Sequence, residues 1–236
     1  MARRGDTVIG IDLGKHLFKA VSLRRKTDQR LILTSFASRE ISQEISSVDE
    51  LAQELKQLLK ELGGSAKGCS VAISDPSSIL RIIEQPNTPI GLLRNALRLN
   101  GLAVLNQECK EFVLDVAPVN AHATETVSED GAGGNIAVQA VATKTKYLVV
   151  GAMRSFIKQL SDAMAKVRVP LDTVQLAPVC SFNAFEYAYP EIFSNDAFLL
   201  LDMGHLQSTV LIGSKGELVF VRSIDYGGKA LMQALT

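Results

Sequence analysis

The stretch TVIGIDLG at residues 7–14 decides how the rest of the sequence is interpreted. Its apolar and β-branched residues predict a strand, and this strand ends in an Asp-x-Gly sequence that is typical of a tight turn. Residues 17–23, LFKAVSL, continue in an extended pattern, so we expect a hairpin that turns at Gly14 and Lys15. A third strand near residues 30–38 would complete an antiparallel meander.

A helix is expected directly after this meander, over residues 48–62. Ser47 and Glu50 have the spacing of a capping box at its start, and Gly63 marks its end. The apolar residues on one face of this helix are Val48, Leu51, Ala52, Leu55, Leu58, Leu59 and Leu62. A short buried strand follows at 69–74. Three strands, a crossover helix and a returning strand predict an α/β fold in which helices pack on a mixed sheet.

Residues 77–143 are expected to form an inserted subdomain. Asp75 and Pro76 interrupt the α/β pattern, and Pro86 follows soon after them. Residues 120–134 hold few large apolar side chains, which cannot offset the entropy cost of ordering, so we expect a mobile loop there. The other elements expected in this subdomain are strands at 77–85, 111–119 and 135–142 and a helix near 92–99.

Residues 1–76 and 144–194 would together form the first lobe. The elements expected in its second part are strands at 146–152 and 173–177 and helices at 155–167 and 179–187. Residues 195–236 then repeat the opening order, because the strand FLLLDMG at 198–204 ends in a second Asp-x-Gly and precedes two strands and a helix. We therefore expect an internal duplication whose second copy is only the start of a second lobe.

The two Asp-x-Gly turns are the strongest functional signals in the sequence. Gly14 and Gly204 would let backbone N–H groups approach phosphate oxygens, while Asp12 and Asp202 at the strand ends are suited to hold a hydrated Mg²⁺. The same tripeptide is common in turns that bind nothing. Two copies in matching contexts nevertheless favour a clamp on the phosphates of a nucleotide.

These turns carry a resemblance to a known superfamily. Residues 8–14 with residues 19–23 resemble the phosphate-1 motif of the actin-like ATPases. Residues 201–204 with Ser208 resemble the phosphate-2 motif, and Gly227-Gly228 resembles the helix start that follows it.

Two further stretches indicate one family within this superfamily. YLVVGAM at 147–153 and ILRIIEQP at 79–86 are most similar to the PilM family of type IV pilus assembly proteins, which is related to FtsA. The resemblance implies an actin-like ATPase (ribonuclease H-like) fold, ATP and Mg²⁺ in the cleft between two lobes, and at most a slow ATPase activity. It also implies a cytoplasmic protein, peripheral to the inner membrane, that reaches the membrane only through a PilN-like bitopic inner-membrane protein. Self-association is a further option.

The site residues implied by the resemblance follow from the matched motifs, with Asp12 and Asp202 as metal ligands. The expected phosphate contacts are Gly14, Lys15, His16, Lys19, Gly204, Ser208, Gly227 and Gly228. Lys15 and His16 stand where the family usually has small hydroxyl residues, and His205 likewise follows the second turn. The side chains of Lys15 and His16 could either contact phosphate or occupy its place. Because the family's later adenosine-binding glycines would lie beyond the last residue, we expect weak or absent nucleotide binding.

Composition disfavours some alternatives. The sequence has 25 Lys and Arg against 25 Asp and Glu, so no overall positive charge attracts nucleic acid, and a two-metal nuclease is disfavoured. A sugar-kinase-like phosphotransferase of the same superfamily stays open, but it needs a catalytic base, for which Asp115 and Asp172 are the only loose candidates. Three widely spaced cysteines fit poorly with a disulfide framework and favour the cytosol.

The resemblance also suggests where a partner would dock. A PilN-like N-terminal peptide would lie on the first lobe, beside the inserted subdomain near residues 77–119. Apolar candidates for the wall of this channel are Ile79, Ile82 and Leu93. Ordinary core packing explains each of these residues equally well.

Overall fold

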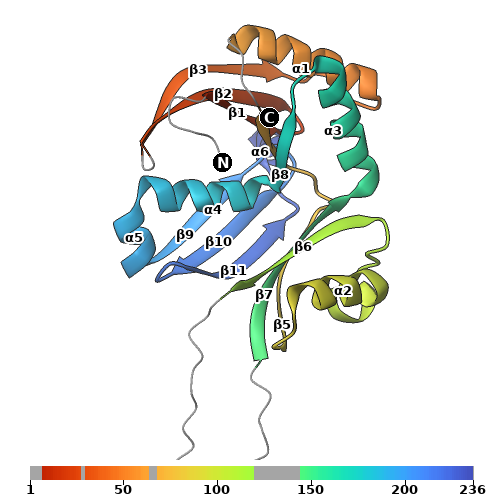
Figure 1. Cartoon of the computed structure of the whole chain (residues 1–236), viewed down its shortest axis with the longest axis vertical. Helices are drawn as coiled ribbons and strands as arrows, with labels where there is room; N and C mark the ends of the chain where they lie inside the picture. The colour runs from red at the N-terminus through yellow and green to blue at the C-terminus, as the bar shows by residue number, and fades with distance from the viewer. Residues whose placement is uncertain (1–6, 28–29, 64–67, 120–143, 236) are drawn as a thin grey trace, which may run out of the picture.

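The computed structural model describes residues 7–27, 30–63, 68–119 and 144–235. The loop expected at 120–134 and the strand expected at 135–142 lie outside these ranges. Within them the chain forms three β-sheets, with helices between and around them (Figure 1).

The first sheet is the mixed sheet that the sequence predicts. Its strands and crossover helix are β1 (Thr7–Leu13), β2 (Leu17–Thr27), β3 (Arg30–Glu40), α1 (Val48–Leu62), β4 (Cys69–Ile73) and β8 (Leu171–Leu176). The strand order is β3-β2-β1-β4-β8, in which β1 pairs antiparallel with β2 and parallel with β4. The C-terminal ends of the parallel strands β1 and β4 therefore lie side by side at one end of the sheet. The first Asp-x-Gly turn begins there.

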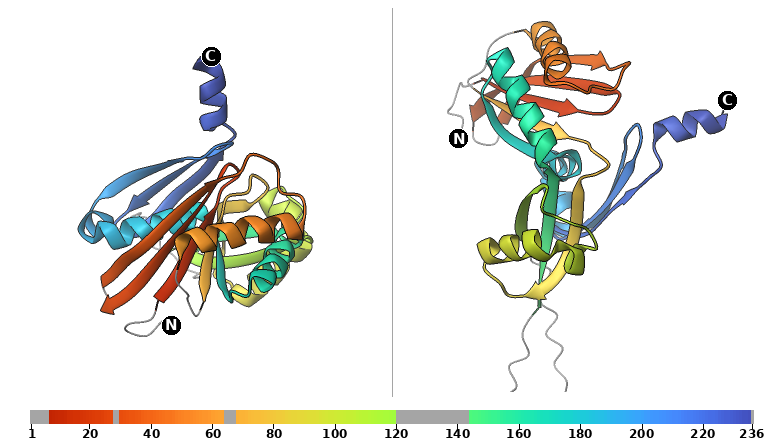
Figure 2. Two further views of the ribbon diagram at one scale, coloured as in Figure 1. Left: turned by 90° about the horizontal axis from the view of Figure 1, so that it is seen from above. Right: turned by 90° about the vertical axis from the view of Figure 1, so that its right-hand side faces the viewer.

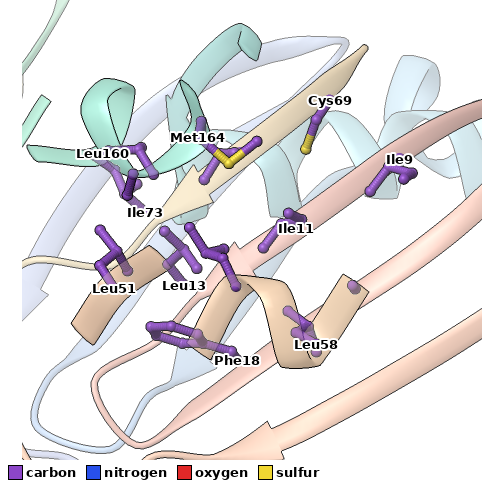
Figure 3. Packing of buried hydrophobic residues seen from close by; sticks show 14 of the residues in the cluster. Ile9, Ile11, Leu13, Phe18, Leu51, Leu58, Cys69, Ile73, Leu160 and Met164 are labelled. Carbon is purple, nitrogen blue, oxygen red and sulfur yellow. The ribbon is translucent and has the colours of Figure 1, made fainter. Parts of the chain in front are cut away.

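Two helices, α1 and α3 (Arg154–Val167), pack against each other and cover one face of this sheet (Figure 3). Ile9 and Leu13 of β1 are buried in one cluster with Leu58 of α1 and Leu160 of α3. Fully burying an aliphatic side chain contributes about 1.5–3 kcal/mol. This cluster is the main core, and it holds β1 and its turn in place.

The boundaries of α1 confirm the capping pattern read from the sequence. The Ser47 hydroxyl accepts a hydrogen bond from the Glu50 N–H at 3.2 Å, and the Glu50 carboxylate accepts one from the Ser47 N–H at 3.1 Å. Gly63 ends the helix at φ 69°, in the left-handed range that glycine adopts without strain.

The second sheet includes most of the described residues of the expected inserted subdomain. Its elements are β5 (Ile79–Pro86), α2 (Ile90–Leu105), β6 (Phe112–Val119) and β7 (Lys144–Met153). The strand order is β5-β7-β6, and α2 packs on the sheet with its own buried cluster, which includes Leu97 and Val149. β7 lies just beyond the boundary expected at residue 143, yet it pairs along its whole length with β5 and β6, and the boundary itself stays a prediction. The apolar pattern of β7 predicts a strand but cannot identify distant partners.

The third sheet repeats the opening of the chain. Its region comprises α4 (Ala177–Ala188), α5 (Pro190–Asn195), β9 (Ala197–Met203), β10 (Ser208–Ser214), β11 (Glu217–Ile224) and α6 (Gly228–Leu235). The three strands form an antiparallel meander of order β11-β10-β9, and α6 follows them, so the predicted internal duplication is confirmed. The short helix α5 was not expected from the sequence.

Helix α4 joins the first and third sheets. It contacts β4 and β8 on one side and β9 and β10 on the other, and Figure 1 shows it between the two sheets. Phe182 of α4 packs against Phe193 and Phe198, with ring centroids 5.2 and 5.8 Å away. Phe182, Phe193 and Phe198 are therefore packing residues. In contrast, α6 projects away from the sheets (Figure 2). Among the described helices, none combines the length and apolar character needed to cross a membrane.

Candidate functional site

A cavity of about 650 Å³ lies between the first and third sheets. The first Asp-x-Gly turn lines it from one side and the second turn lines it from the other. The segment after β4 and the start of α4 complete its wall. The two turns that the sequence singled out, 190 residues apart in matching contexts, therefore face one space.

The two turns have the same local geometry. The Gly14 N–H donates to the Leu17 carbonyl at 3.2 Å, and the Gly204 N–H donates to the Gln207 carbonyl at 3.0 Å. A Cβ added at either glycine would lie 2.8 Å from the carbonyl oxygen that accepts this bond. Close approach of the backbone thus explains why glycine occupies both positions.

Asp12 and Asp202 are the next-to-last residues of β1 and β9, and both line the cavity. Lys19 Nζ lies 3.2 Å from Asp12 Oδ2, whereas Asp12 Oδ1 is buried and has no hydrogen-bond partner within the described ranges. Burial, followed by the negative charge of Asp12, raises the pKa of Asp202 above its usual value. Two carboxylates that line one cavity, one of them with an unsatisfied oxygen, suit a bound cation, so these residues fit a hydrated Mg²⁺.

Lys15 does not extend freely into the cavity. Its Nζ lies 2.9 Å from Asp75 Oδ2, on the segment that follows β4. Burial opposes the ionised form of Asp75, but hydrogen bonds from Ser77 and Lys15 outweigh it and lower the pKa of Asp75. The sequence showed Asp75 only as a break in the strand pattern, since a partner 60 residues away leaves no local signal.

The imidazole rings of His16 and His205 stack against each other across the cavity. Their centroids are 4.5 Å apart and their planes differ by 20°. Both residues line the cavity, and each belongs to one of the two turns. Burial, and then the positive charges of His16 and Lys229, lower the pKa of His205. Of the two roles expected for His16, this arrangement favours occupying the space between the turns.

The second turn is fastened to the start of α6. The N–H groups of Gly228 and Lys229 donate to the carbonyls of Gly204 and His205, each at 2.9 Å. Of the expected phosphate contacts, Ser208 and Gly227 are not among the residues that line the cavity. The buried Ser208 hydroxyl donates to the Tyr226 carbonyl at 2.6 Å.

Gly227 has a similar role beneath the second turn. A Cβ at this position would lie 2.6 to 2.7 Å from three backbone atoms of the turn, His205 O, Gln207 N and Gly204 O. In this structure Ser208 and Gly227 therefore support the turn, and direct contact with a phosphate stays a prediction for both.

The start of α4 supplies wall residues that the sequence did not indicate. Ala177, Pro178 and Cys180 line the cavity. Burial, and then the charge of Asp12, raise the pKa of the Cys180 thiol, so it is a poor nucleophile at neutral pH. The only feature of the sequence that marks this part of the cavity wall is a proline at the start of the helix.

Comparison with family models and with curated sequences finds no match. Among solved structures, the PilM-PilN type IV pilus biogenesis complex is similar to this chain at 22% identity, with a TM-score of 0.75 over 98% of this chain. A Bacteroides thetaiotaomicron protein with an actin-like ATPase fold and unknown function is similar at 12% identity, with a TM-score of 0.54 over 98% of this chain and 75% of its own. This chain has the actin-like ATPase fold. The fold that the sequence motifs implied is thereby confirmed, as is the resemblance to PilM at the level of the fold. The chain spans 65% of the length of the matched chain in the PilM-PilN complex.

Proposed function

We propose that this chain is a PilM-like scaffold of type IV pilus assembly, which binds nucleotide phosphates in the cleft and docks a PilN-like inner-membrane protein. The observation that carries the proposal is the structural similarity to the PilM-PilN complex, which extends over 98% of this chain. The protein would work on the cytoplasmic side of the inner membrane and would reach the membrane through that partner.

The phosphate site is argued from the two turns. Gly14 and Gly204 bring backbone close to the cavity, and Lys19 supplies a positive charge beside Asp12. Asp12 and Asp202 would hold Mg²⁺, which when bound neutralises charge on the phosphates of ATP. Contacts to the purine are not provided by these motifs, so we propose that ATP binds weakly to this chain and that its hydrolysis is at most slow.

The partner site is proposed between the first lobe and the inserted subdomain. Ile79 and Leu93 are buried in the cluster beneath α2, so they serve the core of the subdomain. The neighbouring Leu80 belongs to the core of the first sheet. Ile82 is only partly buried and lies on the strand that links these two clusters. Of the three candidates, Ile82 is therefore the residue that best fits an apolar wall for a peptide.

The experiment is a calorimetric titration of this chain with the N-terminal peptide of PilN from the same organism. Ile82→Asp should weaken peptide binding at least about tenfold, since it would place a charge in an apolar contact. Asp202→Ala, in the cleft, is the matched control and should leave peptide affinity unchanged. Circular dichroism verifies that both variants are folded. Normal binding by folded Ile82→Asp with loss of binding in Asp202→Ala would move the partner site into the cleft.

A second assay separates the scaffold from the sugar-kinase-like alternative. ADP release from ATP is measured with and without a panel of sugars. A scaffold should show the same slow rate in every case. Sugar-dependent ADP release at ordinary turnover would contradict the scaffold and support the phosphotransferase.

A further inference from the structure

His16 and His205 form the one ring-to-ring contact that joins the two turns within the described ranges. His16 follows the first turn glycine by two residues, and His205 follows the second by one. His16 is exposed and His205 is half-buried, so water and small ions reach the pair. The stacked rings stand between the backbone segments that would bind phosphate.

The stack depends on the protonation state of the rings. Two imidazole rings attract each other when at least one is neutral, but two imidazolium ions at 4.5 Å repel each other. Usual histidine pKa values lie near 6.5, so this change falls within the physiological range.

The charged groups around the pair decide the direction of the effect. Lys229, at the start of α6, opposes protonation of His205. Lys15 is compensated by its ion pair with Asp75, and Lys19 by its ion pair with Asp12. Asp202, at the end of β9, is the other carboxylate of the cavity. In the stacked state the turns therefore hold the rings together. The positive charges around the pair disfavour protonation of the second ring.

We infer that His16 and His205 form a latch that separates when a polyphosphate enters the cleft, and that both rings then donate hydrogen bonds to its oxygens as imidazolium ions. This inference rests on the proposed phosphate binding and adds its regulation by pH. The ligand class is an inorganic or nucleotide polyphosphate, because only closely spaced phosphates offer negative charge to both turns at once.

Proton uptake follows from this arrangement. The lowered pKa of His205 in the stacked state rises when an anion replaces the neighbouring ring, so binding takes up protons and becomes tighter as pH falls. Uptake of one proton changes affinity by up to about tenfold per pH unit near the pKa. Between pH 8 and pH 6 we expect the affinity for tripolyphosphate to rise about tenfold.

The first test needs no ligand. The chain has three histidines, and single substitutions His16→Gln, His205→Gln and His122→Gln assign their ring protons in NMR spectra. In a titration from pH 8 to pH 5, His16→Gln should raise the pKa of His205 and shift its ring resonance, because it removes both the neighbouring charge and the stacked ring. His122→Gln is the control and should leave the titration of His205 unchanged. A His205 titration that is identical with and without the His16 ring would overturn the latch.

The second test measures tripolyphosphate binding by calorimetry at pH 8, 7 and 6. The double variant His16→Gln with His205→Gln should lose the tenfold dependence on pH. Tripolyphosphate also changes its own protonation over this pH range. This change affects both proteins equally, so it cancels when their affinities are divided at each pH. Equal pH dependence in the two proteins would overturn the inference while leaving phosphate binding intact. Absence of tripolyphosphate binding at every pH would overturn both the inference and the proposed phosphate site.

Discussion

The first and third sheets start from the same sequence pattern and reach very different degrees of burial. Ile9 and Ile11 of β1 are 5% and 3% exposed, whereas Leu199 and Leu201 of β9 are 61% and 55% exposed. Both strands end in the same turn, with the same glycine hydrogen bond. Strand and turn are therefore properties of the local sequence, and burial is a property of what covers the strand.

The covering elements differ in the two cases. In the first sheet α1 and α3 pack over β1, and their apolar faces close the core. In the third sheet α4 and α5 pack against one face only, and the face with Leu199, Leu201 and Met203 stays exposed within the described ranges. Exposed apolar area of this kind contributes little to stability, so the first sheet should dominate the free energy of unfolding.

The largest expected effect is a cavity in the first sheet. Leu58→Ala removes a fully buried side chain of α1 and should lower the free energy of unfolding by about 2–5 kcal/mol in urea titrations. The matched control, Leu201→Ala on the third sheet, should change it by less than about 0.5 kcal/mol. A loss of several kcal/mol in Leu201→Ala would break the comparison, because it would mean that this face is covered in solution.

The two Asp-x-Gly turns have the same local geometry, so the same substitution in each compares the stability of the two sheets. Gly14→Ala would push a Cβ against a backbone carbonyl and should cost about 1–3 kcal/mol of global stability. Gly204→Ala meets the same obstacle, but its sheet contributes less to the core. It should therefore accelerate amide exchange over residues 197–214 with a smaller global loss. Equal global losses would show that the two sheets unfold as one unit.

A smaller effect is expected from the support of the second turn. Ser208→Ala removes a buried hydroxyl and leaves the Tyr226 carbonyl without this donor, which should cost about 1 kcal/mol. Ser214→Ala, at the far end of the same strand, is the control. Amide exchange at Gly228 and Lys229 provides the readout, and unchanged protection there would contradict the supporting role of Ser208.

The smallest effects concern two carboxylates of the cleft, whose pKa values move in opposite directions. The lowered pKa of Asp75 means that its ionised form stabilises the fold at neutral pH, and that this stability is lost as pH falls through the folded-state pKa. Asp75→Asn should therefore lower stability at pH 7 by up to about 1 kcal/mol, and the difference should vanish in acid. Urea titrations from pH 7 to pH 3 measure it.

The raised pKa of Asp202 predicts the reverse. Its ionised form costs stability above the unfolded-state pKa, and that cost disappears as pH falls below it. Asp202→Asn should make the chain slightly more stable at pH 7 and should have no effect in acid. A loss of stability at pH 7 would contradict the burial and the repulsion from Asp12 that raise this pKa.

The sequence predicted those features that depend on neighbouring residues. The capping box of α1 and the strand before each turn are local, and they appear where expected. The pairing of β7 with β5 and β6 was missed, because strand pairing is decided by distant segments. The ion pair of Lys15 with Asp75 and the stacking of His16 on His205 were missed for the same reason. The sequence had indicated these residues one by one, but not which of them would meet.

The link between the second turn and α6 gives the molecule a mechanical property. Because the first N–H groups of α6 bond directly to the carbonyls of Gly204 and His205, the turn and the helix must move together. A small rotation at the turn would then give a larger displacement at Leu235, the last described residue of a helix that projects from the sheets (Figure 2). Such a rotation would therefore also shift the exposed apolar side chains of α6, which are Leu231, Met232 and Leu235.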